Sequence, residues 1–210
     1  MSAPTNFDAN PATTSSDFLD VLYRRRAVRS YKPGTVDEHV VRELLDAAVH
    51  APTAMHQEPW RFVIVQDRVA LQRISERAKS MAREQAAHHG NLLRAPGAAG
   101  GGIASVLADP EFNIFYDAGT LIVICAEPSN DFLAADCWLA AENLMLAACA
   151  RGLGTCCIGF AVQALNAPET KRELQIPASV QAFVPLILGA PRTEPDIVPR
   201  RPAAVISWVR

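Results

Sequence analysis

The feature that most constrains the fold is a set of short runs in which nearly every residue is apolar. Leu121–Ala126 (LIVICA) and Phe183–Gly189 contain no charged residue, and Arg61–Gln66 (RFVIVQ) is apolar between its ends. Runs of this length without alternation are typical of strands that are covered on both faces. Val205–Val209 has the same character and is predicted to be a further strand. The sequence therefore predicts one central sheet of at least four strands between two layers of helices.

Segments with apolar residues at helical spacing separate these runs. We expect helices that begin at Phe18 after a Ser16 or Asp17 cap, that open at 35–38 and stop before Pro52, and that cover 68–88, 131–150 and roughly 162–174. The helix over 131–150 is rich in Ala, Leu, Cys and Met and is apolar on most faces. Such a helix belongs in a core or at a subunit interface.

The chain is expected to form one domain over residues 17–210, preceded by a polar, flexible tail over 1–16. The segment 90–115 has poor periodicity and contains the glycine-rich run 97–102, so we expect it to form a lid or an excursion from the domain. Phe112, Phe115 and Tyr116 lie in or beside it. These aromatic side chains form either a substrate wall or ordinary packing.

The composition excludes several classes of protein. A formal net charge of −2 argues against a general binder of nucleic acid or of membrane surfaces. No apolar run approaches the roughly 20 residues of a membrane span. The five cysteines lie in apolar stretches without the spacing of a metal site, which favours buried, reduced thiols in a cytoplasmic protein and predicts no metal.

Three separated segments have the residue types of a ligand site. Arg25–Tyr31 crowds arginines at a helix end, and arginine forks bind phosphate oxygens. Ala51–Trp60 is a short loop of hydrogen-bonding side chains between prolines, just before a buried strand. Gly152–Gly159 follows a helix and lacks the dinucleotide fingerprint, although its glycines would admit a flat ligand. Each segment taken alone also fits an ordinary surface or connector.

The three segments in this order resemble the nitroreductase family of FMN enzymes. The family patterns are an RRSxRxF-like stretch, here 25–31; an APSxxNxQPW-like loop, here 51–60; and a GLGxxxIG-like turn, here 152–159. A strand, a proline loop and a terminal arginine follow over 186–202. The resemblance implies an α+β fold, a three-layer sandwich with a central, mostly antiparallel sheet flanked by helices, in an interlocked homodimer that holds FMN between its protomers.

The resemblance also assigns roles to residues. Arg25, Arg26 and Arg200 would hold the FMN phosphate, Ala27 would line the ribityl chain, Arg29 would reach the pyrimidine edge, Pro52, Thr53 and His56 would contact the flavin from the other protomer, and Ile158 and the Gly159 amide would lie beside the reactive ring nitrogen. A cation at the pyrimidine edge stabilises the reduced flavin.

Four positions depart from the family pattern. Ala27 stands where serine is usual, His56 where asparagine is usual, Glu58 where glutamine is usual, and Val198 where a lysine is frequent. His56 keeps a donor for a flavin carbonyl and can titrate near neutral pH. Glu58 would bring negative charge towards an electron-rich ring, so it is not assigned as a contact.

The implied activity is an FMN-dependent NAD(P)H oxidoreductase. Hydride passes from NADH or NADPH through the flavin to a nitroaromatic, a quinone or a similar small conjugated acceptor by ping-pong kinetics, with no catalytic side chain. Other FMN chemistry remains open, namely ene reduction, dehalogenation, flavin breakdown or natural-product dehydrogenation. A non-catalytic flavin-binding protein and a structural dimer without cofactor are the alternatives from other classes.

Overall fold

The computed structural model describes residues 18–89, 103–194 and 198–209. The elements in chain order are α1 (Phe18–Arg24), α2 (Glu38–Val49), the 3₁₀ helix η1 (Ala54–His56), β1 (Trp60–Val65), α3 (Arg68–His89), α4 (Ile103–Ala108), β2 (Thr120–Ala126), α5 (Leu133–Ala150), β3 (Gly154–Cys157), α6 (Ala161–Asn166), α7 (Pro168–Glu173) and β4 (Gln181–Gly189). The predicted tail over 1–16 and the glycine-rich run 97–102 lie outside the described residues.

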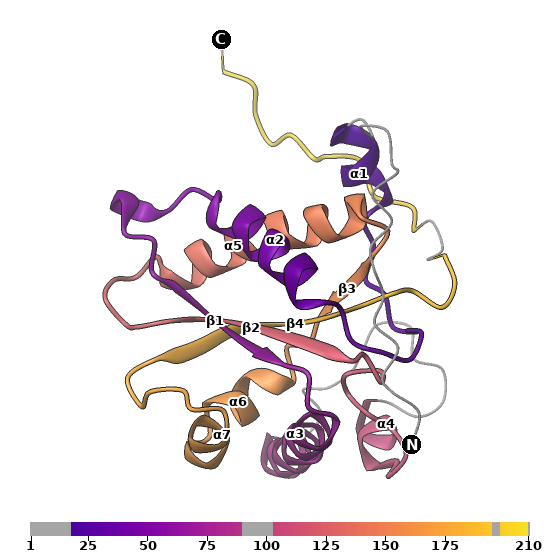
Figure 1. The fold of residues 1–210 in the computed structure, drawn as a ribbon. Coiled ribbons are helices and arrows are strands. Elements are labelled where there is room, and N and C mark those ends of the chain that lie inside the picture. Colours follow the sequence, from indigo (N-terminus) through magenta and orange to yellow (C-terminus); the bar gives the residue numbers. More distant parts are fainter. Residues whose placement is uncertain (1–17, 90–102, 195–197, 210) are drawn as a thin grey trace.

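The four strands form one antiparallel sheet in the order β1-β2-β4-β3. Trp60 pairs with Ala126 at one end of the β1–β2 ladder, and a register shift interrupts the β2–β4 ladder after Ile124. At the far edge Gly154 of β3 pairs with Gly189 of β4. The sheet lies between two layers of helices, so the predicted α+β three-layer sandwich is confirmed (Figure 1).

Each face of the sheet has its own hydrophobic core, because side chains alternate along a strand. Leu121 and Val123 of β2 are fully buried among residues of α3 and α6. Ile122 and Ile124, their neighbours along the strand, are buried among residues of α2 and α5. In Figure 1, α2 and α5 lie above the sheet and α3, α4, α6 and α7 lie below it. The uninterrupted apolar runs are explained by this double cover.

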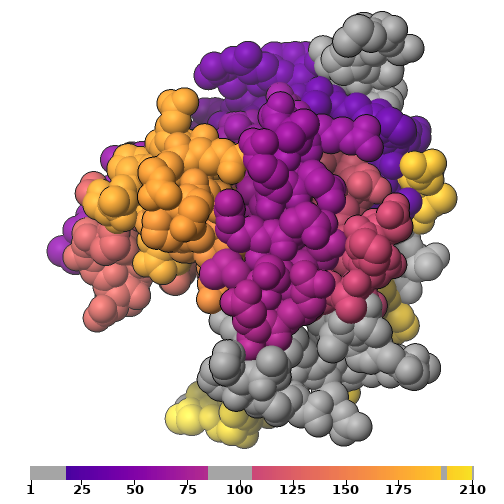
Figure 2. All heavy atoms as spheres, turned by 90° about the horizontal axis from the view of Figure 1, so that it is seen from below, coloured from indigo at the N-terminus to yellow at the C-terminus, as the bar shows by residue number. Residues whose placement is uncertain are grey.

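The lower layer is arranged around α3. Figure 2 shows α3 across the centre of that face, with the region of α6 and α7 on one side and the region of α4 on the other. Leu71, Ile74 and Ala78 lie on the buried face of α3, in agreement with the helix predicted over 68–88.

Helix α5 is the most apolar of the long helices. Cys137, Ala140 and Leu144 are fully buried against the sheet. Its length and composition alone would satisfy a test for a membrane-crossing helix, a test that core helices of soluble proteins also pass. The packing against β2 and β4 places α5 in a core, as predicted.

Three local expectations were wrong or incomplete. Val205–Val209 is not a strand, because a strand needs a neighbouring ladder and residues 198–209 are exposed without one. The helix expected near 162–174 is divided into α6 and α7, with Pro168 at the first turn of α7, where a missing N–H costs nothing. Strand β3 was not predicted within the glycine-rich turn.

Candidate functional site

The arginine-rich segment lies flat on the β3–β4 edge of the sheet. Ala27 makes a parallel bridge with Thr155, and the Val28 N–H donates to the Thr155 carbonyl at 2.9 Å. A Cβ atom on Gly154 would come within 2.6 Å of Val28 Cγ2, and one on Gly189 within 2.9 Å of Tyr31 Cδ1. Such distances are shorter than side-chain atoms tolerate. The segment can therefore pack this closely against β3 and β4 only because both positions are glycine.

Before the bridge, the segment lines a cationic cavity of about 710 Å³. Its basic lining residues are Arg24, Arg25, Arg26, Lys32 and Arg192, against one acidic residue, Glu194. Clustered cations at a cavity are easiest to explain by an anionic ligand, because without one they repel one another.

The arginines of this cavity differ in how well they are partnered. The Arg25 guanidinium pairs with Glu142 at 3.3 Å. Arg26 donates from Nη1 to the carbonyls of Tyr23 at 2.5 Å and Arg25 at 2.7 Å. Its Nε is buried and has no partner among the described residues. A buried donor without an acceptor is costly, so this N–H is a candidate for a phosphate oxygen.

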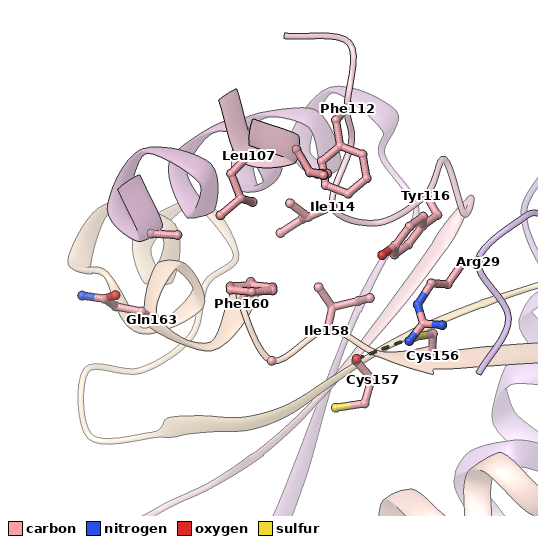
Figure 3. Close-up of a pocket in the computed structure, with 13 residues that line it drawn as sticks. Arg29, Leu107, Phe112, Ile114, Tyr116, Cys156, Cys157, Ile158, Phe160 and Gln163 are labelled. Atoms are coloured by element: carbon pink, nitrogen blue, oxygen red, sulfur yellow. Dashed lines mark hydrogen bonds between the residues drawn. The ribbon is translucent and has the colours of Figure 1, made fainter. Parts of the chain in front are cut away.

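After the bridge, Arg29 lines a second cavity of about 630 Å³ (Figure 3). Leu107, Phe112 and Ile114 lie together on one side of it, and Tyr116 directs its hydroxyl into the space near Ile158. Phe160 and Gln163 bound it on the α6 side. A largely apolar cavity with one arginine at its end suits a flat molecule that carries negative charge at one edge.

The cysteines beside this cavity are poor nucleophiles at neutral pH. Burial raises the pKa of Cys157 to about 11. Burial also raises the pKa of Cys156, and the adjacent Arg29 guanidinium partly offsets that rise. All five cysteines are free, three of them buried and Cys149 and Cys157 half-buried, which agrees with reduced thiols. Within residues 18–89, 103–194 and 198–209, no cluster of His, Cys, Asp or Glu has the arrangement of a metal site.

The turn after β3 offers a free backbone donor to the same cavity. Gly159 lines the cavity, and nothing lies within 4 Å of the position that a Cβ atom would occupy. Its N–H has no partner among the described residues, whereas the N–H of Ile158 donates to the Pro185 carbonyl at 2.9 Å. A ligand in the cavity could therefore reach the Gly159 N–H, and the predicted contact of this amide with the flavin stays a prediction.

The loop 52–58 is strained and anchored to α5. Met55, His56 and Glu58 have φ angles of 55°, 53° and 44°, a left-handed conformation that is unfavourable for side chains other than glycine. Asp136 of α5, 2% exposed, accepts the Ala54 N–H on Oδ1 at 3.1 Å. Its Oδ2 is buried without a partner among the described residues. Strain of this kind is typical of functional loops.

The structure brings together only part of the predicted site. Arg25, Arg26 and Arg29 line the two cavities together with Ile158 and Gly159, and the exposed Ala27 lies between them. The loop residues Pro52, Thr53 and His56 line neither cavity, and Arg200 lies on the exposed C-terminal segment, also outside both.

Of the three aromatic residues, Phe112 and Tyr116 line the apolar cavity, whereas Phe115 is fully buried in the core. Ordinary packing therefore accounts for Phe115, whereas a substrate wall that contains Phe112 and Tyr116 stays a prediction.

The cavity residues that sequence reasoning missed include Lys32, Phe160, Gln163 and Arg192. Arg192 donates to the Tyr31 carbonyl at 3.2 Å, across 161 residues of sequence. The signal that would have found it is the pairing of β3 with β4, because that pairing brings the end of β4 beside the arginine-rich segment.

Comparison with known proteins gives a consistent result. A protein of Archaeoglobus fulgidus with the provisional name NADH dehydrogenase/NAD(P)H nitroreductase is 28% identical over 183 residues, which cover 85% of this chain and 87% of the relative. The crystal structure of a Bacteroides fragilis nitroreductase with bound FMN superimposes with a TM-score of 0.73 at 24% identity, covering 93% of this chain and 98% of the other.

An iodotyrosine deiodinase bound to FMN and 3-iodo-L-tyrosine superimposes with a TM-score of 0.67 at 24% identity, covering 90% of this chain and 97% of the other. At these identities the likeness establishes the fold. The profile of the nitroreductase family matches residues 22–189, which include the arginine-rich segment, the strained loop and the whole sheet. The chain therefore belongs to the nitroreductase family.

Proposed function

We propose that this protein is an FMN-dependent oxidoreductase that uses NADH or NADPH to reduce a nitroaromatic, a quinone or a similar conjugated acceptor, with ping-pong kinetics. The observation that carries the proposal is the placement of one arginine-rich segment across two cavities. Arg25 and Arg26 line the cationic cavity and Arg29 lines the apolar one. A cofactor with a phosphate at one end and a flat ring at the other needs both kinds of surface.

The residues present fit such a cofactor. Arg25 and Arg26 would bind the phosphate, with the unpartnered Nε of Arg26 as one donor. Arg29 would lie at the electron-rich edge of the ring, where a fixed cation stabilises added negative charge. The free N–H of Gly159 would approach the ring from the turn after β3. When bound, FMN supplies the electron transfer itself.

The remaining predicted contacts would come from a second copy of the chain. In the single chain the loop with Pro52, Thr53 and His56 lies apart from both cavities, so the proposed site is complete only in a homodimer. Large apolar side chains are exposed on the same side of the sheet as that loop: Phe18, Leu19 and Tyr23 of α1, Met55 of η1, Phe132 at the N-cap of α5, and Trp138 and Leu139 of α5. A surface of this kind is typical of a subunit interface.

The C-terminal segment supports the same assembly. Val205, Ile206, Trp208 and Val209 are 65–101% exposed on a segment that extends away from the body of the molecule (Figure 1). Burying these side chains against a partner would stabilise the dimer and would give Arg200, on the same segment, a fixed position. We also propose that the protein is cytoplasmic, because its five cysteines are free.

An anaerobic titration tests the function. The purified protein is expected to show flavin absorbance that is bleached by NADH or NADPH and restored by a quinone or a nitroaromatic. A folded, colourless protein that does not bind added FMN would overturn the proposal. Bound flavin that nicotinamide reduces but no acceptor reoxidises would instead indicate a flavin-binding protein without turnover.

A reductive dehalogenase is the second candidate. Its support is the structural likeness to the iodotyrosine deiodinase and the unusual loop side chains His56 and Glu58, which lie on strained backbone. Release of iodide from an iodinated phenol by the reduced protein, faster than reduction of menadione, would favour this candidate over the first. The opposite order would remove it.

A further inference from the structure

Lys79 of α3 is a buried cation outside both cavities. Its side chain is 1% exposed, which is rare for a lysine because a buried charge is costly unless it is fully partnered. Its ammonium group has three N–H donors and three acceptors: Glu76 Oε1 at 2.7 Å, the Phe112 carbonyl at 2.8 Å and the Asp109 carbonyl at 3.2 Å. Every donor of Lys79 is therefore used.

The same face of α3 makes further polar contacts with the turn that follows α4. The Ile114 N–H donates to Ser75 Oγ at 3.1 Å, and Asn113 Nδ2 donates to Gln72 Oε1 at 3.2 Å. Positions 72, 75 and 79 are three and four residues apart, so they lie on one face of the helix. This face holds the turn 109–114 mainly through backbone groups, with one further bond from the Asn113 side chain.

The fastened turn carries one wall of the apolar cavity. Phe112 and Ile114 line the cavity, and the ring of Phe112 meets that of Tyr116 edge to face, with centroids 5.6 Å apart at 81°. Figure 3 shows these side chains gathered on one side of the space. Lys79 does not line the cavity, but it holds the carbonyl of the residue that does.

We propose that Lys79 is the positioning residue of the acceptor wall and a determinant of acceptor specificity. By fixing the backbone of Phe112, it holds the Phe112–Tyr116 pair as a preformed aromatic surface, which favours flat aromatic acceptors. A preformed wall binds such a molecule without the cost of ordering the turn. The inference rests on the proposed function, because it concerns the same cavity.

The first test does not depend on activity. Amide hydrogen exchange is measured on the cofactor-free protein for wild type and Lys79→Met, a substitution that keeps an unbranched side chain one atom shorter and removes the charge. Exchange at residues 109–114 is expected to accelerate at least about tenfold, with loop 53–58 unchanged. Unchanged exchange at 109–114, or equal acceleration in both segments, would overturn the proposal even if the protein proves not to be an oxidoreductase.

The second test separates positioning from general damage. For Lys79→Met, the KM for menadione is expected to rise about tenfold, while the rate of ferricyanide reduction and the rate of flavin reduction at saturating nicotinamide stay within twofold. Glu76→Gln is the matched control, because its Oε1 can still accept from Lys79, and its KM should equal that of wild type. A uniform loss for all acceptors would contradict a role in specificity.

A double-mutant cycle with Phe112→Leu tests the route of the effect. If Lys79 acts through the Phe112 ring, Lys79→Met should change the menadione KM less than twofold in the Phe112→Leu background. A full additional tenfold change there would overturn the proposal. Lys79→Gln, which keeps two donors, replaces Lys79→Met throughout if the latter does not yield folded protein, with the same directions expected.

Discussion

The loop 53–58 and the turn 109–114 lie on opposite sides of the sheet, and each is fastened to a helix by one buried charged side chain. Lys79 of α3 meets three acceptors and leaves no donor unused. Asp136 of α5 accepts the Ala54 N–H on one oxygen, while the other oxygen has no partner among the described residues. All hydrogen-bonding donors of Lys79 are therefore satisfied within one chain, whereas one oxygen of Asp136 is not satisfied by any residue described.

The difference predicts which part of the proposed site would depend on a second protomer. The loop held by Asp136 contains three left-handed side-chain residues, whereas the turn 109–114 contains none, and Tyr116 and Asp117 adopt that conformation only beyond it. Strained backbone persists only where the surroundings determine it fully. We infer that the surroundings of the 53–58 loop are completed by the proposed second protomer, and that the wall held by Lys79 forms without it.

The largest expected effect is a loss of stability when Lys79 and its three contacts are removed. Lys79→Met should lower the free energy of unfolding by about 3 kcal/mol, because the partly buried carbonyls of Asp109 and Phe112 lose their donor and Glu76 loses its cation. Urea unfolding should show the same loss at low and high protein concentration. A loss confined to dilute protein would show that this wall also depends on assembly.

Alkaline pH should weaken both faces of the sheet by similar amounts. Burial raises the pKa of Cys125 to about 11 on the α3 face and of Cys137 to about 12 on the α5 face, from an ordinary value of 9.0. Because the folded-state values lie above the unfolded one, each thiol stabilises the fold fully below pH 9 and loses that contribution as the pH rises. Each should remove about 2 kcal/mol by pH 10.5.

The measurement is the free energy of unfolding from urea titrations between pH 7.5 and 10.5. Cys125→Ala and Cys137→Ala should each flatten the pH dependence by their share, whereas wild type keeps the full slope. Equal slopes in all three proteins would show that the buried thiols do not control stability in this range.

Asp136→Asn should have a smaller effect that depends on assembly. The side-chain oxygen of asparagine can still accept from Ala54, so the contact within the chain survives. The second carboxylate oxygen becomes an amide donor, which would oppose any donor that reaches it in the assembled protein. We expect FMN affinity and dimer affinity to fall by about 1–2 kcal/mol each. Affinities equal to those of wild type would mean that the anionic fastening is also complete as it stands.

The smallest effect is expected for Gln57→Ala. Gln57 Oε1 accepts from Asn130 at 2.8 Å and from Ser129 at 3.3 Å, and both hydrogen bonds are exposed. Loss of these contacts should cost no more than about 0.5 kcal/mol and should speed proteolysis within residues 53–58. A larger loss would show that surface contacts, and not Asp136, hold the loop.

The fold was readable from the sequence where burial leaves a strong pattern. The run Leu121–Ala126 is covered on both faces, so no polar residue interrupts it, and the helix over 68–88 shows its buried stripe clearly. Val205–Val209 has the pattern of a strand but no neighbouring ladder in the single chain. A sequence pattern indicates that a segment favours strand conformation. It does not indicate whether the fold supplies a neighbouring strand with which that segment can pair.

The site was readable where several residues of a motif lie close together. Arg25, Arg26 and Arg29, which crowd one segment, and Gly159, which ends a glycine-rich turn, were expected at a ligand site and do line the two cavities. Lys79 gave no signal, since a single lysine in a helix is ordinarily a surface residue and two of its three acceptors are backbone carbonyls some thirty residues away. Arg192 was missed for the same reason, because only the closed sheet brings it to Tyr31.

The paired glycines under the arginine-rich segment have a consequence for biosynthesis. Gly189 is in the last strand of the sheet, so the surface that receives Val28 and Tyr31 does not exist until most of the chain has left the ribosome. The arginine-rich segment is therefore synthesised before the strand against which it packs. Until the β3–β4 edge closes, Val28 and Tyr31 lack the surface against which they pack in the folded chain.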